Sequence, residues 1–295
     1  MKLIEPNVEI IEQPIGVDEI FKHIEKAGRT CYKSEDKITE DSARKFVEML
    51  TNHKHGAMLE HGTIYITIHW TYSKCEVFDD MVKFYTKNKY SRCKRVLINE
   101  DDLCPDLFIT TNYRVIVENN RFSDLVYMCW ATEHHDVRVT AKFTLDQGVM
   151  REFTRHRTFS FACESTRYCN YTKDKFGGEI TFVRPSTLDR EVLDSYGPYH
   201  TVIRNKSPES VFIASLNNSE KDYMDLIKLG WQPQQARAVL PLATKCELIM
   251  TGFIDDWKHF LSLRSSDYGA TGAHPDASYL ANMLYAKLRE KNYIS

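Results

Sequence analysis

The sequence predicts a single domain that mixes β-strands with α-helices. Segments whose apolar residues alternate, as in half-buried strands, stand beside segments whose apolar residues recur every three or four positions, as in amphipathic helices. The 295 residues, 42% of them hydrophobic, are enough to bury one large core. No repeat, low-complexity tract or long linker rich in Pro, Gly or Ser divides the chain. We therefore expect one domain over residues 1–295.

The first half of the chain predicts three strands and one helix. Residues 63–70 and 137–143 alternate apolar and polar side chains, which indicates strands. Residues 77–90 have a helix-like pattern, and residues 113–118 are a further strand candidate. The stretch of about seventy residues between the outer two strands, approximately 72–136, is expected to be an insertion within the domain.

A helix is expected directly after residues 137–143. The sequence from Thr144 to Gln147 has the pattern of a capping box, so this helix should start near Thr144. It carries Arg151, and the run from Arg155 to Arg157 leaves its C-terminal end. We therefore expect the helix to fix the position at which these arginines enter the following loop.

The second half reads as mainly helical. Ser207 precedes a proline and opens a long helix that Gly230 closes, and residues 233–241 form a short helix between two prolines. Residues 244–251 are a weaker strand candidate. Two further helices are expected: one from Asp255 with the apolar stripe Trp257, Phe260 and Leu261, and a last one with Leu280, Met283, Leu284 and Leu288 on one face.

Arg264 stands at the end of an apolar helical stripe, which is an unusual place for a charge. Burying a guanidinium without a partner costs several kcal/mol or more. Arg264 therefore either extends to water, as is common near helix ends, or meets an anion.

Residues 155–168 contain three arginines, a histidine and two serines among Phe, Ala and Cys residues. The planar fork of arginine matches phosphate oxygens, so we interpret this run as an anion-binding site; a solvated surface loop is the alternative. The formal net charge is -2, so the positive charge is local. That balance disfavours a general nucleic-acid-binding protein.

The eight cysteines are scattered, without a Cys-x-x-Cys pair or metal-finger spacing. We expect free thiols in a reducing compartment and no metal site. Cys163 and Cys169 stand beside the cationic run, which leaves a reactive thiolate open as an alternative to buried packing. The longest apolar runs are strand-sized and the N-terminus is acidic where a signal peptide is apolar, so we expect a soluble, cytoplasmic protein.

The run Arg155-His-Arg157, seven residues and then Ser165 resembles the signature of the flavin-dependent thymidylate synthases, the ThyX family. Four further segments match the family pattern in the same order along the chain. They are Gly28-Arg-Thr-Cys31, His53 through His61, Ala236 through Leu242, and Phe260 through Arg264.

This resemblance implies a fold, an activity and an assembly. The fold is a single α/β domain of the α+β type, with a mixed or antiparallel sheet flanked by helices. The activity is that of a methyltransferase: reductive methylation of dUMP to dTMP, with bound FAD, methylenetetrahydrofolate as carbon donor and NADPH or NADH as reductant. The assembly is a homotetramer in which each active site is built from several subunits.

The resemblance also implies roles for individual residues. No enzyme cysteine attacks the base in this family; instead the position of Arg264 lies against the pyrimidine and stabilises it with its ring nitrogen deprotonated. A cation aimed at developing negative charge in a dry pocket contributes roughly 3 to 4 kcal/mol. Arg264 and Ser165 are the implied catalytic residues.

The implied binding residues fall into two sets. The residues that match the dUMP site are Arg151, Glu152, Arg155, Cys163, Glu164, Ser165, Arg167, Arg237 and Arg264. The residues that match the FAD and folate sites are Cys31, His55, Glu60, Arg155, His156, Arg157 and His259. For His55, Glu60 and His259, a side chain satisfied by backbone groups is the alternative.

Three positions depart from the family pattern. Glu152 stands where glutamine is common, Cys163 where glutamate or glutamine is common, and Asp255 where arginine is common near the adenine end of FAD.

Two other hypotheses for the function also stay open. One is a nucleotide- or RNA-binding protein that uses the arginine cluster with Tyr168 and Tyr171 as a stacking platform. The other is a flavoprotein that oxidises NAD(P)H without methylating.

Overall fold

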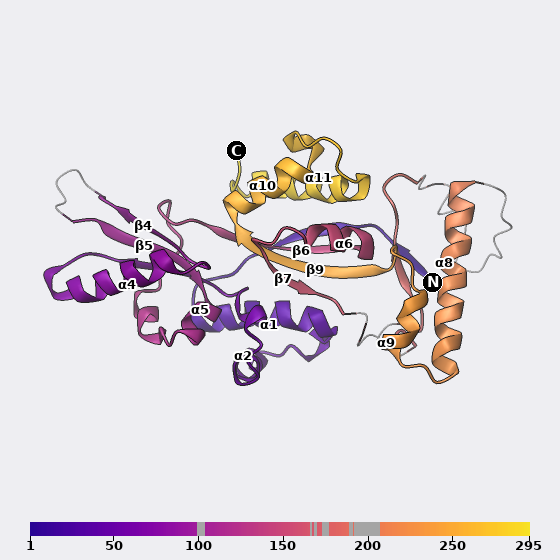
Figure 1. Cartoon of the computed structure of the whole chain (residues 1–295), viewed down its shortest axis with the longest axis horizontal. Coiled ribbons are helices and arrows are strands. Elements are labelled where there is room, and N and C mark those ends of the chain that lie inside the picture. Colours follow the sequence, from indigo (N-terminus) through magenta and orange to yellow (C-terminus); the bar gives the residue numbers. More distant parts are fainter. Residues whose placement is uncertain (99–103, 166, 168–169, 173–176, 189–190, 192–206) are drawn as a thin grey trace.

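The computed structural model describes residues 1–98, 104–165, 167, 170–172, 177–188, 191 and 207–295. Three parts follow one another along the long axis of the molecule (Figure 1). The central part is a four-stranded sheet between helical layers. A three-stranded sheet with its own helices lies at one end, and the long helix α8 lies at the other. The predicted α+β class, with antiparallel sheets flanked by helices, is confirmed.

The central sheet has the strand order β2-β6-β9-β7. It consists of β2 (Asn7–Ile11), β6 (Arg138–Asp146), β9 (Lys245–Phe253) and β7 (Ser160–Cys163), and all neighbours are antiparallel. The two long strands, β6 and β9, pair along their whole length and place the short strand β7 at an edge. Because side chains alternate along each strand, the two faces of this sheet carry different residue types.

One face of the central sheet is apolar and is covered by helices α6 (Gln147–Phe153), α10 (Ile254–Arg264) and α11 (Pro275–Glu290) (Figure 1). Trp257 is fully buried there, and its indole Nε1 donates a hydrogen bond to the Val139 carbonyl at 3.1 Å. Aromatic rings from the sheet, α6 and α10 pack edge to face in this core. We call this surface of the sheet the apolar face.

The opposite face, here called the polar face, is covered by α1 (Val17–Tyr32), α2 (Ser42–Asn52) and the short α3 (Gly56–Leu59) (Figure 1). The helix α1 lies against the sheet, and α2 packs on α1.

A buried layer of hydrogen bonds joins these helices to the polar face. His23 Nε2 lies 2.9 Å from Thr140 Oγ1, Thr140 lies 2.8 Å from Thr251 Oγ1, and His61 Nδ1 lies 2.8 Å from that same threonine oxygen. Burial lowers the pKa of His23 to about 4 and that of His61 to about 3, so both imidazoles are neutral at physiological pH.

The second sheet has the order β3-β5-β4 and is antiparallel. Its strands are β3 (Thr63–Ile68), β5 (Asp106–Asn112) and β4 (Arg92–Val96), and its helices are α4 (Cys75–Lys87) and α5 (Tyr113–Glu118). Its core continues into that of α1 and α2, so the two parts share one hydrophobic cluster. The strand predicted at 63–70 therefore belongs to this second sheet and not to the central one.

At the other end of the molecule, β1 (Lys2–Ile4) pairs in parallel with β8 (Thr181–Val183). Beside them lie α8 (Pro208–Lys228) and α9 (Pro233–Ala236) (Figure 1). The side chain of Ser207 caps α8 by accepting a hydrogen bond from the amide of the third residue on, as its place before a proline predicts.

Two sequence predictions are wrong in detail. Residues 113–118 are the helix α5, not a strand, because the Asn112 side chain caps it by accepting a hydrogen bond from Val115 N at 3.2 Å. The helix α6 starts at Gln147, not near Thr144. Asp146 is its N-cap, and Thr144 still belongs to β6, where it pairs with β9.

The other predicted elements are confirmed as α4, β6, α8, α9, β9, α10 and α11. In the part of the chain that the structure describes, no helix is both long and apolar enough to cross a membrane.

Candidate active site

The apolar face brings three of the candidate residues together at its rim. Arg264, at the end of α10, pairs with the Glu152 carboxylate of α6, with Nη1 and Oε2 separated by 2.5 Å. Its Nε also donates to His156 Nε2 at 3.2 Å. The Arg264 side chain is 19% exposed and that of Glu152 is 35% exposed. The charge at the end of the apolar stripe is therefore paired within the protein.

The contact with Arg264 defines the state of His156. A guanidinium only donates, so His156 Nε2 must accept and its proton must sit on Nδ1. Burial, together with the nearby Arg264 and His259, lowers the pKa of His156 to about 4. His156 is thus a neutral ring that orients Arg264 without adding charge.

Further arginines and a histidine lie on the same side of the sheet. Arg151 on α6, Arg155 and Arg157 directly after it, and His259 on α10 are all exposed. Within the described part of the chain, no carboxylate forms an ion pair with Arg151, Arg155 or Arg157. Uncompensated, exposed guanidinium groups fit an anionic ligand such as a phosphate or the diphosphate of FAD.

A second group of candidate residues lies where β7 ends. Ser165 N donates to the Cys31 carbonyl of α1 at 3.0 Å, and Arg167 N donates to Ser165 Oγ at 3.3 Å. Arg167 Nε also donates to Gln234 Oε1 of α9 at 3.1 Å. Backbone and side-chain hydrogen bonds thus bring Cys31, Ser165 and Arg167 together at this end of the polar face. Arg237 directly follows α9, the helix that Arg167 contacts, and is exposed.

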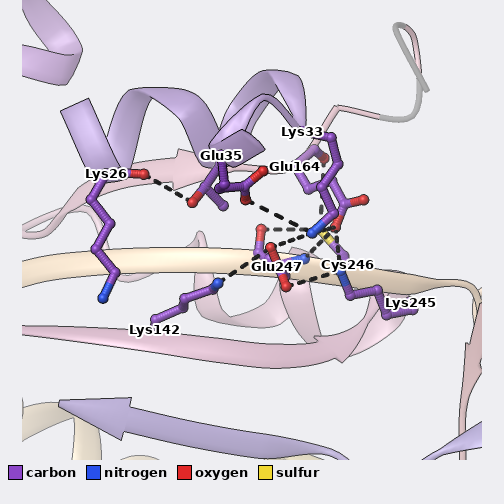
Figure 2. A network of polar contacts seen from close by, with 9 residues as sticks. Lys26, Lys33, Glu35, Lys142, Glu164, Lys245, Cys246 and Glu247 are labelled. Atoms are coloured by element: carbon purple, nitrogen blue, oxygen red, sulfur yellow. Dashed lines mark hydrogen bonds and ion pairs between the residues drawn. The ribbon is translucent and has the colours of Figure 1, made fainter. Parts of the chain in front are cut away.

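Glu164, the residue before Ser165, lies in a network of lysines and carboxylates (Figure 2). Its Oε2 accepts from Lys245 Nζ at 2.8 Å and from Glu247 N at 3.1 Å, and Lys33 Nζ lies 3.7 Å away. Lys33 Nζ also donates to Glu247 Oε2 at 2.5 Å, and Lys142 Nζ lies 3.4 Å from the same oxygen.

The charges in this network compensate one another. Burial by itself would raise the pKa of Glu247, but Lys245, Lys33 and Lys142 outweigh it and hold the value at about 2. Lys33 stands in the left-handed conformation, with φ +48, at the residue after α1. Glycine is favoured there, and another residue type costs roughly 1 to 2 kcal/mol. The ammonium of Lys33 offsets this cost by bridging two buried carboxylates.

Glu60 and His55 are placed apart from both groups. The carboxylate of Glu60 accepts from Ser160 Oγ and from Arg114 Nη1, each at 2.6 Å. Both of its oxygens are therefore engaged within the protein. His55 is exposed, directly before α3, and its ring lies 6.1 Å from that of His53.

The cysteines beside the candidate residues are not activated. Burial raises the pKa of Cys31 to about 11 and that of Cys163 to about 12, so neither is a thiolate near neutral pH. This burial disfavours the alternative of a reactive Cys163, and Cys169 lies outside the described residues. In that same part of the chain, no group of three or more His, Cys, Asp or Glu side chains gathers as a metal site.

Asp255 departs from the family pattern, and its partner is an arginine of the second sheet. Arg92 of β4 donates to Asp255 Oδ2 at 3.1 Å, and its guanidinium lies over the Phe253 ring at 4.0 Å. The carboxylate is 67% exposed. The residues between β3 and β6 therefore reach back to the start of α10.

Sequence reasoning missed the lysines of the network and Arg114. The usable signal was the alternation of β9, in which Lys245 and Glu247 occupy positions that face a covered side of the sheet. Charged residues at such positions are almost always paired. Their partners, Lys33 and Lys142, come from α1 and β6, and no sequence spacing identifies them.

The stacking platform considered for RNA is not formed. Tyr171 is 6% exposed and packs edge to face against Tyr223, with ring centroids 5.5 Å apart. A buried ring cannot stack on a base. Tyr168 lies outside the described residues.

Residues 82–292 match the family described as "Thymidylate synthase complementing protein". The chain belongs to this family. The resemblance seen in the motifs is confirmed, because curated flavin-dependent thymidylate synthases also match.

A probable flavin-dependent thymidylate synthase of Paramecium bursaria Chlorella virus 1 is 26% identical over 179 residues, which cover 58% of this chain and 78% of the viral protein. The flavin-dependent thymidylate synthase of Synechocystis is 25% identical over 200 residues, which cover 65% of this chain and 89% of the Synechocystis protein. The flavin-dependent thymidylate synthase of Halobacterium salinarum is 30% identical over 113 residues, which cover 36% of this chain and 46% of the halobacterial protein. The match thus spans about half of the halobacterial relative.

Solved structures are also similar. A UMP/dUMP methylase of Streptomyces cacaoi, crystallised with 5-Br dUMP, aligns over 98% of this chain and 93% of its own, with 18% identity and a TM-score of 0.42.

Proposed function

We propose that the protein is a flavin-dependent thymidylate synthase. It transfers a one-carbon unit from methylenetetrahydrofolate to dUMP, and NADPH or NADH supplies the electrons through bound FAD. The observation that carries the proposal is the position of Arg264 in a chain of this family. Its guanidinium is oriented by a neutral histidine and stands beside further unpaired arginines. These groups suit an anionic nucleotide and a pyrimidine that gains negative charge.

The side chains at the apolar face have separate roles in this proposal. Arg264 lies against the pyrimidine and stabilises its deprotonated ring nitrogen, which moves electron density to the carbon that is methylated. Because His156 is neutral, it orients Arg264 without repelling it. Glu152 competes for the same guanidinium and must move aside or share it when the nucleotide binds.

Arg155, Arg157 and His259 are proposed to hold FAD, because their exposed side chains lie on the side of Arg264. Bound FAD would supply the two-electron reduction that the transferred one-carbon unit needs, at the expense of the nicotinamide. Ser165, Arg167, Arg151 and Arg237 are proposed to hold the nucleotide phosphate. His55, Glu60 and Cys31 stay proposals for the flavin and folate contacts; Glu60 is already engaged by two protein donors.

The proposed nucleotide residues lie in two groups, one at the apolar face and one at the end of β7 beside α1. This division supports a homo-oligomer in which the Arg264 group of one subunit faces the Ser165 group of another. Mixing an Arg264→Ala variant with an Arg167→Ala variant tests it. We expect the mixture to recover turnover that neither variant has alone; no recovery after subunit exchange would mean that each site uses a single chain.

The visible absorbance of the purified protein, recorded before and after adding dUMP, tests the function. A two-band flavin spectrum that shifts on adding dUMP is expected, since nucleotide and flavin share one site. A protein that takes up no FAD and does not respond to dUMP would contradict the proposal. Formation of dTMP then distinguishes the synthase from a flavoprotein that only oxidises NAD(P)H.

A further inference from the structure

Glu164 is adjacent to Ser165, yet its side chain is directed into the protein. It is 5% exposed, and Figure 2 shows its carboxylate turned toward Lys33 and Lys245. One of its oxygens accepts from Lys245 Nζ and also from the Glu247 amide. A carboxylate held in this way is unsuited to bind the phosphate of a nucleotide, which would repel it.

The backbone around Glu164 is fixed by the same elements. Glu164 N donates to the Glu247 carbonyl at 2.8 Å, and Ser165 N donates to the Cys31 carbonyl of α1 at 3.0 Å. Glu164 and Ser165 are therefore attached to β9 on one side and to the end of α1 on the other. The ion pairs join the same two elements, because Lys33 follows α1 and Lys245 lies in β9.

Lys33 supplies an independent observation. It occupies a left-handed position where a glycine is free of strain, and its ammonium spans from Glu247 to Glu164. A lysine that is unfavourable for the local backbone but bridges the buried Glu164 and the 12% exposed Glu247 indicates that the bridge matters beyond the helix end.

We propose that Glu164 is a positioning residue for the nucleotide site, and that its ion pairs with Lys33 and Lys245 hold Ser165 and Arg167 in the orientation that binds the phosphate. The inference rests on the proposed function, since it assigns the anion to dUMP. It replaces the expectation that the Glu164 side chain contacts dUMP. Loss of the network should loosen the turn and weaken nucleotide binding without altering the chemical step.

Glu164→Gln is the first test. Glutamine keeps the size and still accepts from the Glu247 amide, but it leaves Lys33 and Lys245 without their charge partner. We expect the KM for dUMP to rise about tenfold and kcat to stay within about twofold. Glu164→Asp keeps the charge and should recover most of this loss. Glu35→Gln is the matched control, because Glu35 lies 3.9 Å from Lys33 without touching the turn; its KM should not change.

Lys33→Gly keeps the proposal falsifiable if Glu164→Gln folds poorly. Glycine relieves the left-handed backbone while removing the ammonium, so it regains part of the stability lost with the ion pairs, and we expect a raised KM for dUMP in a folded protein. An unchanged KM in both variants would overturn the proposal. A fall in kcat at constant KM would also overturn it, because Glu164 would then act at the reacting atoms.

Failure of the inference and failure of the proposed function are distinguishable. Titration calorimetry of the flavin-loaded protein with dUMP gives the dissociation constant directly. Absence of dUMP binding by the unaltered protein would contradict the function itself. Binding by the unaltered protein that Glu164→Gln and Lys33→Gly leave unchanged would contradict only the positioning role.

Discussion

The two faces of the central sheet use charge in different ways. On the apolar face, the buried residues are hydrophobic, and the charged side chains of Arg264, Glu152 and the arginines around α6 stand at the rim. On the polar face, histidines, threonines and Glu164 are buried and bonded to polar groups, and the lysines and Glu247 that pair there are at most 21% exposed. The same two strands, β6 and β9, supply both faces.

This difference separates groups that are available to a ligand from groups that the fold has used. Cations at the rim keep unused donors, so they can exchange protein contacts for a nucleotide or flavin at small cost. Buried charges lose several kcal/mol if a partner is removed, so they serve as fixed supports. Proximity to a motif does not by itself tell the two kinds apart: Glu152 and Glu164 both stand near the signature arginines, but Glu152 is 35% exposed whereas Glu164 is buried.

The largest expected effect is on turnover, and it comes from a change at the rim of the apolar face. Arg264→Ala should lower turnover of dUMP by about a hundredfold to a thousandfold, since loss of one donor to a developing negative charge costs roughly 3 to 4 kcal/mol. Fold and flavin content should be retained, because the side chain is at the rim and not in the core. Turnover and visible absorbance measure both properties.

Arg44→Ala is the control for the Arg264 variant. Arg44 is an exposed arginine whose partner Asp18 is also exposed. Its removal should leave turnover unchanged. Full turnover in Arg264→Ala would exclude the role of this residue on the pyrimidine.

The second prediction concerns the polar face and pH. His23 and His61 have folded pKa values of about 4 and about 3, below the ordinary 6.5, so the unfolded chain binds their protons first as the pH falls. The stabilisation that each neutral histidine contributes to the free energy of unfolding is therefore fully present above about pH 6.5. It is lost as the pH falls toward the folded pKa values, by on the order of 3 to 5 kcal/mol for each histidine.

Urea unfolding between pH 7 and 5 measures this dependence, above the range in which the carboxylate of Glu247 takes up a proton. His23→Gln cannot titrate but can still bond to Thr140, so it should flatten the dependence. The exposed His53→Gln should not. An equal slope in both variants would argue against a buried neutral His23.

Gly28→Ala tests how closely the polar-face helices pack. A Cβ at Gly28 would lie 2.6 Å from the Phe46 ring of α2, so this family-motif glycine is needed for the contact between α1 and α2. We expect a loss of about 1 to 3 kcal/mol in the free energy of unfolding, although alanine is the better helix former.

Chemical denaturation measures the Gly28→Ala effect. The double variant Gly28→Ala/Phe46→Leu should recover part of the loss, because the smaller side chain relieves the contact. Lys45→Ala, exposed on α2, should change stability by less than about 0.5 kcal/mol. A Gly28→Ala variant as stable as the unaltered protein would mean that α1 and α2 can separate freely.

The smallest expected effect is that of Glu152→Gln. Glutamine removes the negative charge that occupies Arg264, so dUMP should bind more tightly, by up to about tenfold or 1.4 kcal/mol. The dissociation constant for dUMP measures it. Weaker binding would show that Glu152 contacts the nucleotide favourably instead of competing with it.

Local signals in the sequence predicted the helices α4, α8, α10 and α11 and the strands β6 and β9, because their apolar periodicity and end residues agree. They failed at residues 113–118 and at Thr144. Residues 113–118 were ambiguous because Val and Ile suit both structures, and the Asn112 cap decided for a helix. At Thr144, pairing with β9 extended β6 past a possible capping box.

The candidate site divided in the same way. Motif spacing identified Arg264, His156, Ser165 and Arg167, because each lies in a segment with a family pattern. It could not assign Glu164 to a lysine network, since the partners Lys33 and Lys245 are far apart in the sequence.

By itself, the sequence determined the fold class, the family and the candidate residues for the chemistry, because these depend on residue type and on spacing within short segments. Only the tertiary structure decided which charges remain available. Contacts between distant segments determine burial, so Glu152 stays 35% exposed beside Arg264 of α10, whereas Glu164 is buried beside Lys245 of β9.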